Sequence, residues 1–190
     1  SIDGSEPIRC HITDPTVPLP DSGRHTVCII ADGMTEGEGK WYEEIGFALK
    51  SVTLAEGGRL WGIKPTAPLV FFYGDSITEG IRAISMAADS DGNSATHAYP
   101  WYCAEALGVT PYFVGYGATG MIRTGWFHTM SKSIDGLSWR HTVADSPAAN
   151  QTPDLIVVNH GTNDMDFSML EFMNAMNATM SLLYRRYPDV

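Results

Sequence analysis

The sequence predicts an α/β domain with a parallel sheet, preceded by a smaller β-rich module. Three short apolar runs, near residues 69–73, 112–115 and 154–159, have the length and composition of buried strands. Helix-like segments follow these runs, and strands that alternate with helices indicate a parallel sheet covered on both faces. The predicted fold is therefore a three-layer α/β domain.

The composition limits the classes of partner. The chain has 190 residues, 44% of them hydrophobic, which is enough for one domain with a core and an appendage. The formal net charge of −10 argues against binding to a nucleic-acid backbone. No apolar run approaches the ~20 residues of a membrane-spanning helix. Three widely spaced cysteines predict neither a disulfide framework nor a metal site. The first residues show no signal-peptide pattern, and the compartment and oligomeric state stay open.

Residues 1–66 differ in pattern from the rest of the chain. The segments Thr26–Ala31 and Phe47–Leu54 have the composition of strands, and glycine-containing turns separate them. No helical period appears before residue 77. We predict an all-β module over 1–66, forming part of a β-sandwich, and an α/β domain over 67–190.

The end of the first apolar run carries the strongest candidate for a catalytic residue. Gly74 and Asp75 lead to Ser76, where the chain turns towards a helix. Backbone N–H groups at the start of a helix point towards such a serine, so an oxyanion formed there meets donors already in place. Asp75 and Ser76 are also common as helix caps, and this turn alone leaves both interpretations open.

Three segments after the serine have helical patterns. Ile77–Ala88 is expected to be helical in part, and Tyr99–Leu107 has a proline in its first turn and a glycine just beyond its end. Ser168 and Glu171 predict a capping box at the start of the last helix. That helix carries apolar residues at steps of three and four, which are expected to face the core: Met169, Phe172, Met173, Met176, Met180, Leu183 and Tyr187.

Two segments imitate ligand-binding motifs. Asp89–Asn93 begins like a calcium loop, but Ser94 and Pro100 occupy the positions that need glycine and glutamate. The glycines from Gly115 to Gly120 have the spacing of a dinucleotide fingerprint, but no acidic residue ends a second strand about 20 residues further on. We therefore predict no metal and no cofactor.

Three blocks of the sequence resemble, in their order, those of the SGNH (GDSL-type) hydrolases: Gly74–Ser76, Gly115–Gly120 and Gly161–Asp164. Each block follows an apolar strand-like run, and the resemblance covers roughly residues 68–190. It implies a flavodoxin-like three-layer fold and ester hydrolysis without a cofactor. Residues 25–47 are similar, more loosely, to the N-terminal β-sandwich of carbohydrate esterases of family two.

The resemblance also implies roles for individual residues. Ser76 is the nucleophile, while the backbone N–H of Gly120 and the side-chain amide of Asn163 join the Ser76 N–H in an oxyanion hole. Asp75 and Asp164 are expected to give structural support. The substrate is expected to be a carbohydrate ester or another small ester.

The segment 121–150 is rich in aromatic residues and histidines, and no pattern defines its structure. It is expected either to cover the core or to form an acyl or sugar pocket beside the serine. Core cover is favoured. Trp126, the aromatic residue nearest to Gly120 in sequence, is the best candidate for a pocket residue.

The fourth block of the family, Asp-x-x-His, supplies the base and is absent from this sequence. Without a base, Ser76 loses most of its activation as a nucleophile. We expect residues 1–190 to be a fragment of a longer enzyme and to hydrolyse short esters poorly. We expect no contact with Ser76 from the four histidines of the α/β domain: His97, His128, His141 and His160.

The leading hypothesis is a serine esterase that removes an acetyl or other short acyl group from a carbohydrate through an acyl-enzyme. The alternative is a non-catalytic carbohydrate-binding or interaction module that keeps the geometry of the site. A flavodoxin-like ligand-binding domain is a third hypothesis. An Asp-x-x-His segment in a longer natural chain would favour the enzyme, and bound nucleotide absorbance would favour the third. The acyl group and the alcohol stay open.

Overall fold

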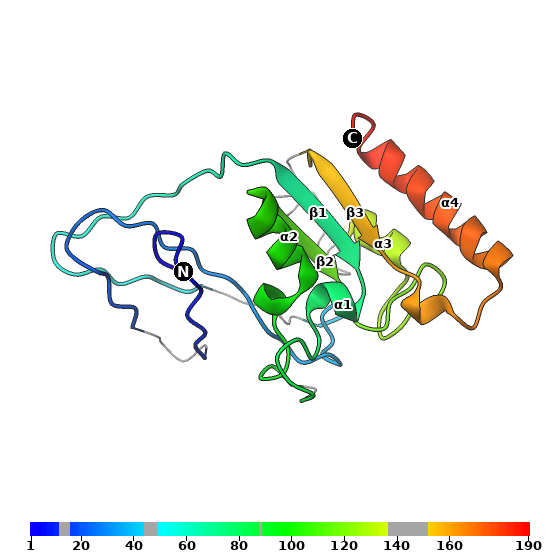
Figure 1. The fold of residues 1–190 in the computed structure, drawn as a ribbon, viewed down its shortest axis with the longest axis horizontal. Coiled ribbons are helices and arrows are strands. Elements are labelled where there is room, and N and C mark those ends of the chain that lie inside the picture. Colours follow the sequence, from blue (N-terminus) through cyan, green and yellow to red (C-terminus); the bar gives the residue numbers. More distant parts are fainter. Residues whose placement is uncertain (12–15, 44–48, 88, 137–151) are drawn as a thin grey trace. The chain divides into compact units, whose positions relative to one another are not determined.

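The computed structural model contains a parallel sheet with helices on both of its faces (Figure 1). It describes residues 1–11, 16–43, 49–87, 89–136 and 152–190. Residues 1–32 and residues 33–190 form two compact units, and the sheet lies in the second. The predicted three-layer α/β fold is confirmed.

Three parallel strands form the sheet in the order β2–β1–β3. β1 covers Leu69–Gly74, β2 covers Thr110–Gly115 and β3 covers Leu155–Asn159, so all three predicted strands are confirmed. Gly74 of β1 pairs with Gly115 of β2 and with Asn159 of β3, so the strands end level with one another. The segments that follow the strands therefore begin at one common edge of the sheet.

Four α-helices surround the sheet within the described residues: α1 (Ser76–Glu79), α2 (Tyr99–Leu107), α3 (Met130–Asp135) and α4 (Met169–Arg186). α2 covers one face of the sheet, whereas α3 and α4 cover the other (Figure 1). The predictions of α2 and α4 are confirmed, including the left-handed Gly108 that ends α2 and the capping box of Ser168 and Glu171. None of the described helices could span a membrane.

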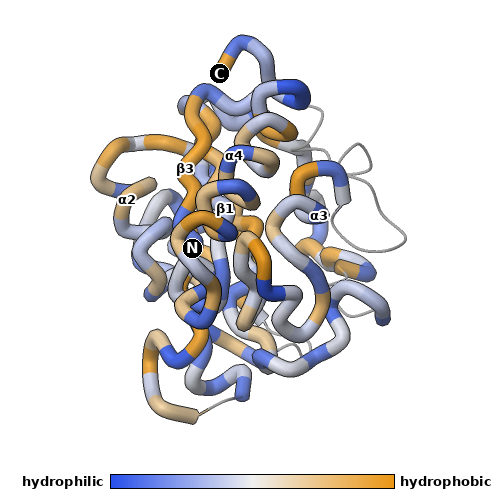
Figure 2. The backbone as a smooth tube through the Cα atoms, turned by 90° about the vertical axis from the view of Figure 1, so that its right-hand side faces the viewer, coloured by the Kyte–Doolittle hydropathy of each residue, from blue (hydrophilic) through white to orange (hydrophobic). Residues whose placement is uncertain are grey.

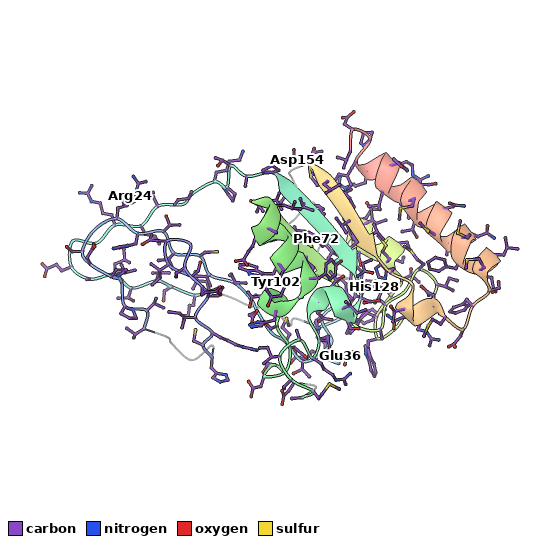
Figure 3. All side chains as sticks on the ribbon, viewed as in Figure 1. Arg24, Glu36, Phe72, Tyr102, His128 and Asp154 are labelled. Atoms are coloured by element: carbon purple, nitrogen blue, oxygen red, sulfur yellow. The ribbon has the colours of Figure 1, made fainter. Side chains whose placement is uncertain are left out.

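The central strand β1 is buried on both of its faces. The Phe71 ring lies against Tyr187 after α4, with 5.9 Å between ring centroids. The next residue, Phe72, points to the opposite face and lies 6.0 Å from the Tyr99 ring of α2 (Figure 3). A strand that is apolar at every position is what a parallel sheet with helices on both faces requires. This explains why the run from Leu69 to Tyr73 shows no alternation.

α4 uses only part of its predicted apolar face. Phe172, Met176 and Leu183 pack against the core of the sheet. Met169 and Met173 are 75% and 44% exposed, so their predicted burial is wrong. The start of α4 lies farther from the sheet than its end (Figure 1), and in its first turns Phe172 contacts the core while Met169 and Met173 do not. Along this helix the tube alternates between hydrophobic and hydrophilic, whereas β3 is hydrophobic along most of its length (Figure 2).

Two strands predicted for residues 1–66 are absent from the described residues. Thr26–Ala31 forms one isolated antiparallel bridge, between Ile2 and Val27, and residues 49–54 form no strand. The remainder of the second predicted strand, residues 47–48, lies outside the described residues. Apolar side chains such as Val27 and Leu49 are exposed, so neither segment has a buried face, and a strand needs a buried face together with hydrogen-bonded neighbours. The β-sandwich over 1–66 stays a prediction.

Residues 33–43 pack within the unit that contains the sheet. Trp41 is only 8% exposed, and its ring lies against Tyr116, which directly follows β2. The compact units therefore divide between residues 32 and 33. The domain boundary between residues 66 and 67 stays a prediction.

Within residues 1–32, a histidine is hydrogen-bonded between two carboxylates and so joins distant parts of this unit. His25 donates from Nδ1 to Asp3 Oδ2 at 2.7 Å and from Nε2 to Asp21 Oδ1 at 3.2 Å. The Asp3 carboxylate also accepts from the Thr26 N–H at 2.8 Å. The hydrogen bond to Asp3 raises the pKa of His25; desolvation opposes the rise, and the hydrogen bond to Asp21 adds to it.

We expect residues 1–32 to loosen as the pH rises. A histidine whose pKa is raised on folding stabilises the folded state below its unfolded pKa, about 6.5, and that contribution is lost as the pH rises through the folded pKa. Amide hydrogen exchange in residues 1–32, corrected for its intrinsic pH dependence, should therefore step upwards above this pH. His25→Gln should remove the step, whereas His11→Gln, at an exposed histidine of the same unit, should keep it. An identical step in the His25 variant would contradict this assignment.

Candidate active site

The predicted nucleophile lies at the start of α1, directly after β1. Asp75 is the N-cap of this helix, and its Oδ1 accepts from the Ile77 N–H at 3.0 Å. Ser76 is the first helical residue and is half-buried. Neither its hydroxyl nor its N–H is hydrogen-bonded to another described residue. Because Asp75 caps the helix, the hydroxyl of Ser76 is left for other contacts.

Close packing of α1 on β1 depends on a glycine. A Cβ atom at Gly74 would overlap the hydroxyl of Thr78, which is fully buried in α1. Any larger residue at this position would push α1 away from the end of the strand, and Ser76 with it. The close packing of α1 on β1 therefore explains why the first block has glycine at position 74.

The amide of Asn163 joins the segments that follow all three strands. Its Nδ2 donates to Asp75 Oδ2 at 3.2 Å and to the Thr119 carbonyl at 2.9 Å. The third block thereby lies beside the serine turn and beside the loop that leads to Gly120. Both N–H groups of the amide have protein acceptors in this arrangement.

Asp164 fixes the turn that follows Gly120. Its carboxylate is 3% exposed and accepts from three consecutive backbone N–H groups: Met121 at 2.7 Å, Ile122 at 3.1 Å and Arg123 at 3.0 Å. A buried carboxylate needs such donors, because its charge is otherwise very costly to remove from water. The structural support predicted for Asp164 has a direct physical basis in these bonds.

Gly120 is buried against the carboxylate of Asp164. A Cβ atom at Gly120 would overlap that carboxylate, so the close approach requires glycine. The Gly120 N–H donates to the Arg123 carbonyl at 2.9 Å, and the Gly120 carbonyl accepts from the Met130 N–H at 2.9 Å. Donation from Gly120 to an oxyanion therefore requires release of the bond to Arg123.

The described histidines have partners other than Ser76. His97 is exposed, and its Nδ1 is 2.9 Å from the hydroxyl of Ser94. His128 is buried among aromatic rings and donates from Nδ1 to the Thr129 carbonyl at 2.8 Å. Burial lowers the pKa of His128 to about 4, which keeps the ring neutral at pH 7.

His160 lies beside the network of the second and third blocks. Burial lowers the pKa of His160, while the charge of Asp75, a hydrogen bond with the Thr119 carbonyl and the charge of Asp164 oppose this shift. No hydrogen bond joins its ring to the predicted nucleophile within the described residues. The fourth histidine, His141, lies outside the described residues. The described part of the chain thus identifies no base for the serine.

A shallow hollow of about 430 Å³ opens beside the third block. Its walls are mainly apolar and consist of His160, Gly161, Asp164, Met165, Phe167, Met169 and Phe172. Trp126, the predicted pocket residue, is not part of these walls, and its side chain is 61% exposed. Residues 137–151 of the predicted aromatic segment lie outside the described residues. Among the described residues, no cluster of three or more His, Cys, Asp or Glu side chains could hold a metal ion.

Residues 34–42 also contribute side chains to this edge of the sheet, and the sequence does not predict them. Lys40 forms an ion pair with Glu79 of α1, and Trp41 packs on His128 with 4.0 Å between ring centroids. No motif or period marks these residues. Glu79, a charged residue three positions after Ser76, is the one sequence signal that points to a partner for α1.

The sheet, the serine turn and the adjoining loops define a three-layer α/β fold, which is consistent with an SGNH-like fold. No protein-family model and no curated protein matches the chain. Solved structures do match it, among them carbohydrate esterases of family two and an acetyl xylan esterase.

Three matches illustrate the similarity. A family two carbohydrate esterase from Clostridium thermocellum in complex with cellohexaose is 22% identical, with a TM-score of 0.55 over 69% of this chain and 43% of that chain. A family two carbohydrate esterase from Cellvibrio japonicus is 21% identical, with a TM-score of 0.55 over 66% and 42%. An acetyl xylan esterase from the rumen bacterium Butyrivibrio proteoclasticus is 18% identical, with a TM-score of 0.58 over 70% and 48%. This chain spans less than half the length of each, and the likeness is one of fold.

We expect Gly120→Ala to destabilise the protein by about 1–3 kcal/mol, the usual range for overpacking a buried site. The new methyl group must displace the Asp164 carboxylate from its three N–H donors. Urea unfolding measures the change. Gly62→Ala is the matched control, because a Cβ atom at Gly62 meets open space, and it should change stability by less than about 0.5 kcal/mol. Equal stability of the two variants would show that the carboxylate can move at little cost.

Proposed function

We propose that this protein removes an acetyl or other short acyl group from a carbohydrate, with Ser76 as the nucleophile. The observation that carries the proposal is the position of Ser76 at the start of α1, directly after Asp75, which caps this helix and accepts from the Asn163 amide. The fold similarity to carbohydrate esterases supports the substrate class, and one of the matched structures contains cellohexaose.

The proposed reaction proceeds through an acyl-enzyme. The Ser76 oxygen attacks the ester carbonyl carbon while a base takes the hydroxyl proton, and the carbonyl oxygen becomes an oxyanion. The intermediate then collapses and the sugar hydroxyl leaves with a proton. Water hydrolyses the acyl-serine in the second half of the cycle, which releases the carboxylate and restores the serine. Backbone and amide N–H groups stabilise the oxyanion in both steps.

The state of the proposed oxyanion donors sets a condition on this mechanism. Asn163 gives both of its amide hydrogens to protein acceptors, and the Gly120 N–H is bonded to Arg123. The Ser76 N–H has no partner among the described residues. A substrate carbonyl must therefore compete with Asp75 or with the Thr119 carbonyl for the Asn163 amide.

A non-catalytic carbohydrate-binding module is the second candidate. It is favoured by the absence of a hydrogen bond between Ser76 and any described histidine. The two functions differ in a simple observable. The enzyme releases acetate from acetylated xylo-oligosaccharides, whereas the binding module retains the oligosaccharide without cleaving it.

We expect Ser76→Ala to abolish acetate release from acetylated xylo-oligosaccharides. The matched control is Ser181→Ala on the exposed side of α4, which should retain the wild-type rate. An organophosphonate should label Ser76 in the wild-type protein, as located by mass spectrometry. Since no base is assigned, the assay should be repeated with added imidazole, which can act as a base from solution and should raise the rate of the wild type but not of Ser76→Ala.

Two outcomes would count against this assignment. Labelling at another serine with Ser76 unmodified would move the nucleophile elsewhere. Tight binding of the oligosaccharide with no acetate release, even with imidazole, would favour the binding module.

We expect Asn163→Ala to lower kcat by about 10²–10³-fold, the range for removing one oxyanion donor. The melting temperature should change much less. Asn177→Ala, at an exposed position of α4, controls for the substitution itself. Because the amide also holds Asp75 and the Thr119 carbonyl, an unchanged kcat with a lower melting temperature would make Asn163 purely structural.

A further inference from the structure

Residues 34–42, called the strap below, cross the edge of the sheet at which the serine turn lies. At one end the Met34 carbonyl accepts from Asn93 Nδ2 at 2.6 Å. At the other end the Tyr42 hydroxyl donates to the Phe127 carbonyl at 3.1 Å. Figure 3 shows Glu36 of the strap near α1, at the end of the sheet opposite Asp154. Both ends of the strap are therefore tied to loops of the α/β unit.

The middle of the strap packs on the loop that follows β2. Glu36 lies against Gly117, where a Cβ atom would be 3.1 Å from the Glu36 Cγ. The ring of Trp41 meets Tyr116 edge-on, with 5.9 Å between centroids. This loop leads directly to Gly120 of the second block. The strap thus touches one of the segments assigned to the oxyanion hole.

The strap is joined to α1 by a buried ion pair. The Lys40 ammonium contacts the Glu79 carboxylate, and the two side chains are only 9% and 14% exposed. Burial lowers the pKa of Lys40 to about 8, and the carboxylates of Glu38 and Glu36 oppose the shift. Removing one partner of such a pair leaves the other charge buried and unpaired, which is strongly unfavourable.

The ion pair acts at the helix that carries the nucleophile. Glu79 is the last residue of α1, three positions after Ser76, so the two side chains share one face of the helix. A helix of four residues has little stability of its own, and its contacts must fix its position. Lys40 is such a contact, from a segment far away in the sequence.

We propose that Lys40 and Glu79 are positioning residues, which hold α1 and its Ser76 in register with the loop before Gly120. The strap is then part of the active site rather than of a separate N-terminal module. This inference rests on the proposed function of Ser76. Neither residue is assigned a chemical step.

The first test measures the position of α1 without using activity. In Glu79→Gln, hydrogen exchange should rise in peptides that cover residues 33–43, 74–82 and 115–120, while α4 keeps the wild-type rate. Trypsin should cleave after Lys40 about tenfold faster, relative to cleavage after the exposed Arg59, because the released strap opens locally. Glu56→Gln makes the same chemical change at an exposed glutamate and should alter neither readout.

The second test links the ion pair to catalysis. Glu79→Gln should lower kcat by about 10–100-fold with a smaller change in KM, because a displaced nucleophile is poorly oriented. Lys40→Met should have a similar effect, and the double variant Lys40→Met/Glu79→Gln should recover much of the loss, because no buried charge is then left unpaired.

Three results would overturn the inference: unchanged exchange at α1 in Glu79→Gln, a rise spread evenly over α2 and α4, or local loosening with an unchanged kcat. A wild-type protein that neither reacts at Ser76 nor releases acetate would instead overturn the proposed function. In that case the exchange and proteolysis results still decide whether the ion pair holds α1.

Discussion

The candidate site depends on one buried carboxylate. Asp164 follows β3, yet its three hydrogen bonds go to the turn after β2, so it sets the distance between these two segments. The neighbouring residue, Asn163, extends the same network to Asp75 at the start of α1. A side chain that must satisfy its charge inside the protein cannot tolerate a loose turn around it. The need for glycine at position 120 follows from this close approach.

Local pattern was enough to predict the elements that bring this carboxylate into place. The apolar run of β1 is continuous because the strand is covered on both faces. A glycine marks the end of α2, and a capping box marks the start of α4. α3 escaped prediction because six residues are too few to show a helical period. The strand expected at 26–31 and residues 49–54 of the second expected strand show the converse error, because strand-like composition forms no sheet without neighbours.

The state of the site was harder to predict than its members. The resemblance to SGNH hydrolases proposes Asn163 and Gly120 as donors, but whether a donor is available depends on its acceptors in three dimensions. The Asn163 amide is bonded to Asp75 and to Thr119, and the Gly120 N–H to Arg123. Residue type and spacing do not reveal whether an N–H group already donates to an acceptor within the protein. The network satisfies its own donors, so in the proposed mechanism a substrate carbonyl must replace an internal acceptor.

The strap is likewise invisible to local sequence pattern, because its key contact joins Lys40 and Glu79, which are 39 positions apart in sequence. Lys40 falls in the part of the chain that composition assigns to an N-terminal module, whereas Glu79 ends α1, three residues after the first block. A protein beginning at residue 67 would keep Ser76, Asn163 and Asp164. It would also leave the Glu79 carboxylate without its cation and Tyr116 without the ring of Trp41. All three blocks would be present, but the helix that carries the serine would lose the contact that fixes its far end. If the ion pair positions α1 as proposed, the minimal unit of this site includes the strap.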